Sequence, residues 1–349
     1  MRTSACLFLW MGLLLVGFAP ARAQDPAADP PPTPSGGDPF TRFALPDDWQ
    51  ATFWAGPGVK ELLTLDAKGL AALVPAQAGF RYCKCPACDA PETDDPLAWS
   101  LAKPDVVTCR KCGVSVPNDA FPAKVPPAPG KPPVVPKESI EVLPRLVHHY
   151  PFHTVDPIKQ DYPDERLYLS ARRDYEARTF FAKAALYAAV RYNQSGRGVR
   201  NAPLARLASV LILRFARVYP TYATHLDQPG LPKILQPADL APPYRRGYQT
   251  AKWDWSGCLD VPLNLVIAYA LIRDDPALID AGRALDDPNP ARTIERDLFR
   301  ASARFTLRQP DEETEASLYA VRGVLAVGRL LGDAALMLEA GRRLDRFAE

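Results

Sequence analysis

Four cysteines with paired spacing are the residues of this chain best suited to chemistry. They form two C-x-x-C knuckles, CPAC at Cys85–Cys88 and CRKC at Cys109–Cys112. Two intervening residues let both sulfurs of a pair turn toward one ion, so two such pairs are typical of a tetrahedral Zn²⁺ site. Four thiolates leave no coordination position open for substrate, and we therefore expect a structural ion. The predicted ligands are Cys85, Cys88, Cys109 and Cys112.

The first residues have the pattern of an export signal. Arg2 supplies a positive start, Cys6–Phe18 is apolar, and the segment 21–23 (ARA) fits the small-x-small cleavage rule. We expect cleavage after residue 23 and an exported protein, periplasmic or secreted. The apolar stretch is too short to span a bilayer comfortably, and we expect no transmembrane segment. Exported thiols commonly form disulfides, so zinc and disulfides both remain open for the knuckles.

Composition sets the expected partners and the domain organisation. The formal net charge is +2, which is too small to attract a polyanion such as nucleic acid strongly. We therefore expect no nucleic-acid partner. Pro accounts for 38 of the 349 residues, and much of it lies in two segments that indicate extended linkers. The predicted organisation is a signal peptide (1–23), a Pro-rich linker (24–38), an N-terminal region (39–136) with a zinc-ribbon-like β module at 80–120 and a second linker, and an α-helical domain (137–349).

Helical periodicity dominates the chain after residue 140. Apolar residues at helical spacing, with Gly and Pro at the ends, predict helices over 170–193, 203–219, 260–273, 291–307, 312–331 and 334–348. One or two short helices are expected within 39–79. The stretch Ile272–Leu285 (IRDDPALIDAGRAL) resembles Leu330–Leu344 (LLGDAALMLEAGRRL), which aligns Asp275 with Asp333. Repeated helical hairpins predict a mainly α fold, and a solenoid, a closed α/α toroid and an irregular helical bundle all remain open.

Four stretches together carry a resemblance to a known family. They are EARTFFAKAALYAAVRY, LILRFARVYPTYATHLDQPG, TAKWDWSGCLDVPLNLVIAYALI and ASLYAVRGVLAVGRLLGDAAL. The residue pattern of these stretches and their order along the chain resemble the N-terminal half of the heparinase II/III and alginate-lyase-like family, over roughly 165–349. The resemblance implies an incomplete (α/α) toroid and an exported polysaccharide lyase that cleaves uronic-acid glycans by β-elimination. Family members continue into a β-sandwich, so it also implies a truncated half, or one that a partner supplying the C-terminal half would complete.

The implied reaction needs a group that neutralises the uronate carboxylate, a base, and an acid for the leaving oxygen. His225 would act as base or neutraliser and Tyr248 or Tyr222 as acid, with Tyr319 in a second cluster of candidates. Arg322 would hold the carboxylate. The predicted substrate-binding residues are Arg245, Arg246, Trp253, Asp254, Trp255 and Asn264. The two tryptophans offer flat faces for stacking on sugar rings, although one could instead fill the core.

Two further functions compete with a lyase. The helix near Glu315 lacks the Asn-His pair that lyases of this type commonly carry, which favours a noncatalytic carbohydrate-binding or helical scaffold protein with a structural zinc site. A protein-interaction module built on helical hairpins and a zinc ribbon is the third hypothesis. Convergence of Tyr319, His225 and Tyr248 in one cleft would favour the enzyme, and their separation would favour the alternatives.

Overall fold

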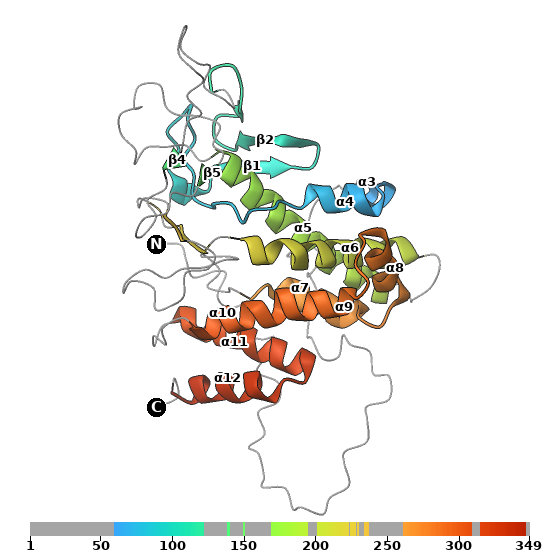
Figure 1. Cartoon of the computed structure of the whole chain (residues 1–349). Helices are drawn as coiled ribbons and strands as arrows, with labels where there is room; N and C mark the ends of the chain where they lie inside the picture. The colour runs from blue at the N-terminus through green and yellow to red at the C-terminus, as the bar shows by residue number, and fades with distance from the viewer. Residues whose placement is uncertain are drawn as a thin grey trace, which may run out of the picture. The chain divides into compact units, whose positions relative to one another are not determined.

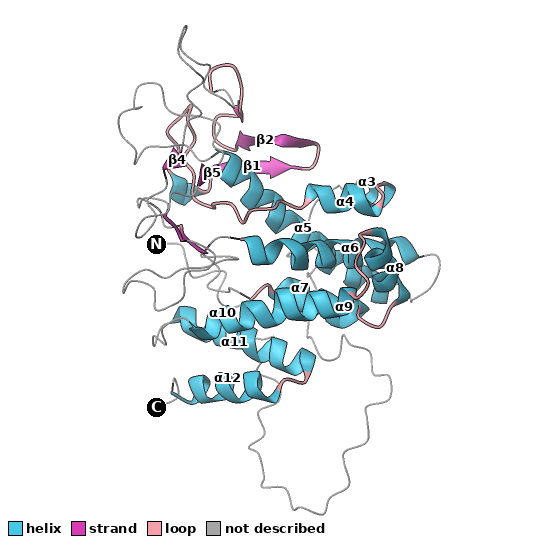
Figure 2. Ribbon diagram, viewed as in Figure 1, coloured by secondary structure: helices cyan, strands magenta, loops and turns pink. Residues whose placement is uncertain are grey.

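The computed structural model describes residues 59–121, 138–139, 149–150, 169–194, 201–222, 224–227, 229, 234–236, 261–308 and 315–346. All of these lie in one unit, Pro57–Glu349. Within them the chain is mainly helical with a small antiparallel sheet, which confirms the predicted fold class at this level (Figures 1 and 2). The predicted signal peptide and the first linker lie outside the described residues.

The helices follow the predicted segments closely. They are α3 (Val59–Thr64), α4 (Ala67–Leu73), α5 (Leu169–Gln194), α6 (Ala202–Val218), α7 (Leu263–Ile272), α8 (Pro276–Ala284), α9 (Pro290–Thr293), α10 (Ala301–Arg308), α11 (Glu315–Leu331) and α12 (Ala334–Arg346), with short 3₁₀ turns at Glu92–Asp94 and Tyr219–Thr221. A π-helical segment, η6 (Ile294–Arg300), joins α9 to α10, so the predicted helix over 291–307 is continuous but locally unwound.

The strands are short and pair only with near neighbours in the chain. β1 (Leu97–Ser100), β2 (Lys103–Cys109) and β3 (Ser115–Val116) form an antiparallel sheet in that order. Two isolated hairpins pair β4 (Glu138–Ser139) with β5 (His149–Tyr150), and β6 (Thr224–Leu226) with β7 (Ile234–Gln236).

Helices α5, α6 and α7 form the centre of the helical part. α5 packs against both α6 and α7, and α6 also contacts α8 and η6 (Figure 1). The predicted apolar face of α5 is buried, with Phe181, Ala184, Ala185 and Ala188 all fully inaccessible. Alanines on this face let the neighbouring backbones approach closely, while larger side chains such as Phe215 of α6 fill the remaining space.

The internal repeat corresponds to two helical hairpins of the same build. α7 and α8 form the first, and α11 and α12 the second. Each second helix begins with the aligned aspartate: Asp275 accepts a hydrogen bond from the Ala277 N–H at 2.9 Å, and Asp333 accepts one from the Leu336 N–H at 3.2 Å. These carboxylates cap N–H groups that lack a partner within the helix. Gly332 ends α11 with φ of 64°, as its position in the sequence predicts.

The sheet packs directly on α5. Leu97, Val107 and Val116 share a hydrophobic cluster with Leu169 and Ala171 at the start of that helix. Trp99 of β1 also lies edge-on to Phe180 and Phe181, with ring centroids 5.1 and 5.8 Å apart. The cysteine-bearing module therefore rests on a helix of the α-helical part through a common apolar core.

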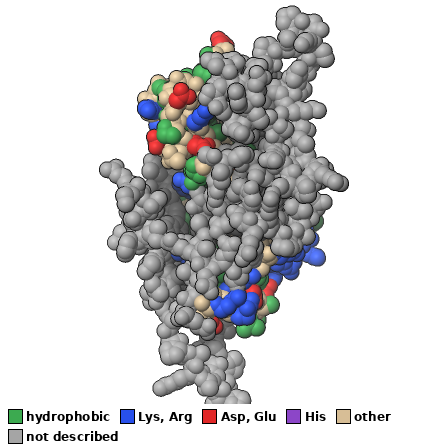
Figure 3. All heavy atoms as spheres, turned by 90° about the vertical axis from the view of Figure 1, so that its left-hand side faces the viewer, with side chains coloured by type: hydrophobic (Ala, Val, Ile, Leu, Met, Phe, Trp, Pro, Cys, Tyr) green, Lys and Arg blue, Asp and Glu red, His purple; other side chains and the backbone are tan. Residues whose placement is uncertain are grey.

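Among the described residues, the exposed large apolar side chains are Ile279 and Leu338. Figure 3 shows one face, on which acidic and basic side chains are mixed near the top while Lys and Arg gather near the bottom. No helix in the described part of the chain has both the length and the apolar character needed to cross a bilayer.

Two glycines provide a matched test of this packing. Gly79 has φ of 79°, and a Cβ there would lie 2.2 Å from the backbone nitrogen of Tyr175 and 2.3 Å from the carbonyl oxygen of Ala171. We expect Gly79→Ala to lower the free energy of unfolding by at least about 2 kcal/mol, since both the backbone conformation and the contact with α5 become strained. Gly341 of α12 has open space around it, so Gly341→Ala should stabilise the chain by up to about 1 kcal/mol. Urea unfolding of both variants checks the pair, and equal effects would contradict the close approach at Gly79.

Candidate metal centre

The four predicted cysteine ligands converge in space. The Sγ atoms of Cys85, Cys88, Cys109 and Cys112 all lie within 4.8 Å of one another. Across the two knuckles, Cys85 Sγ lies 3.7 Å from Cys112 Sγ, and Cys88 Sγ lies 3.8 Å from Cys109 Sγ. All four thiols are free of disulfides. This cluster could hold a metal ion, as the spacing predicts.

The two knuckles have the same backbone structure although their sequences differ. The N–H of the first cysteine in each donates to the carbonyl beyond the turn, Cys85 to Ala90 at 3.1 Å and Cys109 to Val114 at 2.8 Å. Each turn contains a residue with positive φ at the same position, Asp89 with 50° and Gly113 with 76°. The spacing of the cysteines is therefore supported by two matching loops that present both sulfurs of a pair to one side.

Burial and hydrogen bonds give the thiols different acidities. Burial raises the pKa of the Cys85 thiol to about 12, against the opposing hydrogen bonds from the backbone of Ala87 and Cys88. Burial also disfavours the Cys109 thiolate, but hydrogen bonds from the backbone of Cys112 and Lys111 outweigh it and lower its pKa to about 7. Cys109 is thus prepared to act as a thiolate near neutral pH, which is the form that binds metal.

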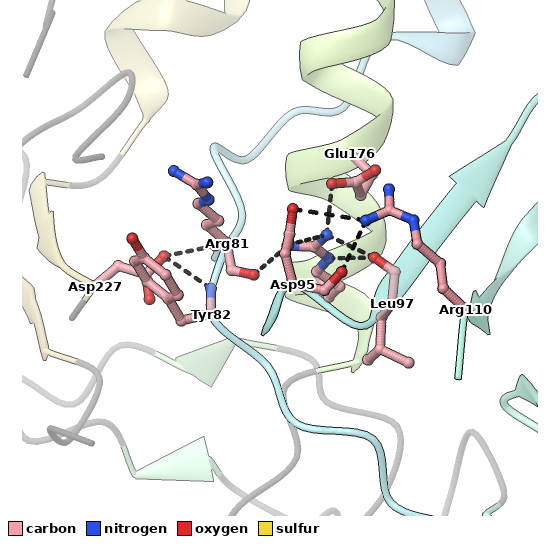
Figure 4. Close-up of polar contacts among 8 residues, drawn as sticks. Arg81, Tyr82, Asp95, Leu97, Arg110, Glu176 and Asp227 are labelled. Carbon is pink, nitrogen blue, oxygen red and sulfur yellow. Dashed lines mark hydrogen bonds and ion pairs between the residues drawn. The ribbon is translucent and has the colours of Figure 1, made fainter. Parts of the chain in front are cut away.

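A buried arginine attaches this module to α5. The Arg172 side chain is completely inaccessible, and its Nε and Nη2 donate to the Leu97 carbonyl at 2.9 and 2.6 Å. Its Nη1 donates to the Arg81 carbonyl. Nη2 also lies 2.6 Å from Asp95 and 2.7 Å from Glu176, the latter one turn along α5. Figure 4 shows these groups converging from the loop, the sheet and the helix.

The charges of this cluster are balanced, but burying them carries a desolvation cost. Desolvation raises the pKa of Glu176, and the positive charge of Arg172 opposes that rise. Asp95 remains about one-third exposed, with 32% of its side chain accessible. A buried guanidinium needs such partners, because an unpaired buried charge costs several kcal/mol. Arg172 meets that need with two backbone carbonyls and two carboxylates.

A second contact connects the cluster to the metal knuckle. Arg110, between Cys109 and Cys112, donates from Nη1 to the Asp95 carbonyl at 2.8 Å (Figure 4). Its backbone N–H donates to the Pro96 carbonyl at 2.8 Å. Asp95 therefore touches both the knuckle and the arginine of α5. Through it, the position of the second knuckle is tied to the start of the helical part.

A third contact holds the chain just before the first knuckle. The backbone N–H groups of Arg81 and Tyr82 donate to Oδ2 of Asp227 at 2.5 and 3.4 Å. Asp227 is buried and follows β6, far away in the sequence (Figure 4). Arg178 adds a bond from its Nε to the Ala78 carbonyl at 2.9 Å. The segment leading into Cys83 is thus fixed by side chains of the helical part.

Among the candidates for lyase chemistry, three have described side chains. Tyr222 is fully buried, and its hydroxyl donates to the Pro75 carbonyl at 3.2 Å; burial raises its pKa well above the usual value. Asn264 lies at the start of α7, where its amide oxygen accepts from the Leu265 N–H at 3.1 Å. Arg322 is half-buried on α11. The described contacts join none of these three to another.

The remaining candidates are placed only in part or not at all. His225 lies on β6, where its backbone pairs with Leu235, and Tyr319 lies on α11. Those beyond the described residues are Arg245, Arg246, Tyr248, Trp253, Asp254 and Trp255. Convergence of the catalytic set therefore stays a prediction.

The polar attachment of the module was not predicted from the sequence. Arg172 and Glu176 stand four residues apart in SARRDYEA, a spacing that indicates a helical ion pair. That signal predicts an exposed pair, because charged side chains are rarely buried. Only the contact with Leu97 and Arg81 shows that the arginine lies in the interior.

Comparison with known proteins identifies no relative from which a role for this centre could be transferred. No family model matches the chain, and neither does any curated protein or solved structure. The role of the cysteine cluster therefore follows from its own geometry and surroundings, and the lyase resemblance stays a prediction.

Two arginines test the attachment of the module. Arg172→Met would leave two buried carbonyls and Glu176 without their donor, and we expect it to lower the free energy of unfolding by about 3–5 kcal/mol. Arg110→Met is the matched control: its side chain is 57% exposed, so the loss should stay within about 1 kcal/mol. Urea unfolding, followed by circular dichroism, measures both. Equal stability of Arg172→Met and the wild type would show that the arginine does not hold the module.

Proposed function

We propose that the tetracysteine cluster binds one structural Zn²⁺ ion and that the module around it is zinc-ribbon-like. The observation that carries this proposal is the sulfur geometry. Zn–S bonds of about 2.3 Å in a tetrahedron place the sulfurs about 3.8 Å apart. The cross-knuckle separations of 3.7 and 3.8 Å agree with that value. A disulfide, by contrast, needs sulfurs about 2.05 Å apart.

The ligand set supports zinc over other metals and a structural role over catalysis. Soft thiolate ligands select Zn²⁺ or iron–sulfur clusters, and four thiolates arranged as one tetrahedron suit a single Zn²⁺ ion. Such an ion has no free position for water or substrate. The negative charge of four thiolates around one Zn²⁺ would be offset in part by basic residues in or beside the knuckles, Lys84, Arg110 and Lys111.

The zinc module in turn supports a helical scaffold, which we propose as the role of the whole protein. The sheet that carries Cys109 packs on α5, and α5 packs on α6 and α7. The two hairpins α7–α8 and α11–α12 then continue the helical array. We propose that this array is part of an incomplete α/α toroid in an exported protein, whose ligands are carbohydrate chains. Support comes from the repeated hairpins and their matching aspartate caps.

Lyase activity on an acidic glycan is the second proposal. Its support is the sequence resemblance over roughly 165–349. A partner that supplies a C-terminal half belongs to the same proposal. Tyr222 is the weakest member of the catalytic set, because its hydroxyl is engaged by the Pro75 carbonyl in the interior.

Metal analysis tests the zinc proposal. We expect one Zn²⁺ per chain in the purified protein, and near-complete loss of it in Cys112→Ser. Cys83→Ser should keep the ion, because Cys83 lies outside the four-sulfur cluster. Chelation should lower the melting temperature by about 5 °C, since a loss of about 4 kcal/mol produces such a shift in a chain of 349 residues, whose unfolding entropy is about 0.7 kcal/mol per kelvin.

Thiol titration separates zinc from disulfides in the same samples. With zinc, every cysteine of the denatured, chelated chain reacts without a reductant. Disulfides would instead leave the knuckle cysteines unreactive until reduction, together with a metal content near zero, and that result would overturn the zinc proposal.

Ultraviolet absorbance of the unsaturated uronate product tests the lyase proposal. The wild type is incubated with a panel of acidic polysaccharides, beside Tyr248→Phe and the control Tyr269→Phe. The hydroxyl of Tyr269, on α7, donates to Glu295 at 3.0 Å and is not a candidate for lyase chemistry, so Tyr269→Phe should leave the rate unchanged. We expect Tyr248→Phe to reduce a lyase rate by about 10²–10⁴-fold, the contribution of a positioned acid or base. Absence of product with every polysaccharide, from folded and zinc-loaded protein, would leave the scaffold as the function.

A further inference from the structure

A small basic pocket lies on the helical part, at the contact of α4, α6 and the end of α8. Its volume is about 320 Å³, and its charged lining consists of Lys68, Arg214, Arg217 and Asp286. Three of these residues are cations and one is an acid. None belongs to the cysteine cluster or to the candidates for lyase chemistry.

Arg214 is the unusual member of the pocket. Its Nε is buried, and no hydrogen-bond partner for that atom lies among the described residues. Burial, followed by the positive charge of Arg217, lowers the pKa of its guanidinium, while Tyr222 acts in the opposite direction. Buried polar groups nearly always have a partner, and a buried charge needs one more than a neutral group does.

Among the described residues, no carboxylate forms an ion pair with Arg214. Arg217 is loosely paired with Asp287, with Nε 3.7 Å from Oδ2, and Lys68 is exposed at the surface of α4. Asp286 is the acid in the lining; it has φ of 57° just beyond the end of α8. Arg206, eight residues earlier on α6, shows how a part-buried arginine is usually satisfied. Its Nη1 donates to the Leu65 carbonyl and its Nη2 donates to the Leu63 carbonyl.

We propose that this pocket binds an oxyanion, the phosphate, sulfate or carboxylate group of an acidic ligand. The planar guanidinium of Arg214 offers paired N–H donors that match two oxygens of such a group. Arg217 and Lys68 add positive charge at the opening. A pocket of this volume accommodates a ligand the size of a small sugar acid or phosphate ester. The proposal is independent of the zinc site and of lyase activity.

Calorimetric titration of the full-length, zinc-loaded protein tests the proposal. The probes are inorganic phosphate, sulfate and acetate, each at constant ionic strength maintained with chloride. We expect saturable binding, and the order of the three probes distinguishes a tetrahedral site from a carboxylate site. Arg214→Met should weaken the best probe by about tenfold or more, since a hydrogen bond to a charged group is lost from a partly buried position.

Two milder variants keep the test decisive if Arg214→Met does not fold. Lys68→Met should weaken binding by about two- to fivefold, and Lys103→Met, an exposed lysine of β2 outside the pocket, should leave it unchanged. Asp286→Asn should tighten binding by about two- to fivefold, because it removes the one acid in the lining while asparagine tolerates the positive φ. Folding of each variant is verified by its melting temperature.

The structure also predicts a readout without ligand. Because no described carboxylate pairs with Arg214, a folded Arg214→Met should melt at or above the wild-type temperature in chloride, and phosphate should raise the melting temperature of the wild type more than that of Arg214→Met. The proposal is wrong if no probe binds saturably, or if Lys103→Met weakens binding as much as Lys68→Met does. Undiminished binding by Arg214→Met, or by Lys68→Met where Arg214→Met does not fold, would also overturn it.

Discussion

The burial of one guanidinium sets the relation between the two halves of the described chain. Arg172 sits at the start of α5 with no exposed surface, and its charge can remain there only if carbonyls and carboxylates surround it. The loop supplies the Arg81 carbonyl, the sheet supplies the Leu97 carbonyl, and Asp95 and Glu176 supply negative charge. Because these partners come from separate segments, the module can dock on the helix in only one way that satisfies all of them.

The cysteine cluster depends on this contact, and a bound ion would reinforce it. The cysteine module is small, with a core of a few side chains around Leu97, Val107 and Val116, and a core of that size contributes little stability by itself. An ion bound by four cysteines would join two knuckles that lie on either side of the β1–β2 hairpin, and the Trp99 contacts with Phe180 and Phe181 then attach the hairpin to α5. A bound ion would restrain the knuckles, aromatic packing restrains the hairpin, and the arginine restrains the loop and the first strand.

The helical part shows how far local signals extend. Apolar periodicity together with Gly and Pro predicted helices at the positions of α5, α6, α11 and α12 to within a few residues, because amphipathic spacing and caps are properties of adjacent residues. The repeat predicted two helical hairpins, and both are present. The aligned Asp275 and Asp333 each cap the second helix of its hairpin. The π segment after α9 was not predicted, since packing against α6 and its neighbours decides where a helix unwinds.

Sequence alone determined the chemistry that adjacent residues can define. The paired cysteine spacing predicted the four-sulfur cluster, since a knuckle is a single turn whose geometry depends on a few consecutive residues. It could not identify Arg172 as an interior anchor, or the partly buried Arg214 with its inaccessible Nε, because each looks like an ordinary surface arginine on a helix. Their roles arise from carbonyls, charges and cavities contributed by distant segments. Only the tertiary structure brings those groups to the same place, and burial then makes each charge depend on its partners.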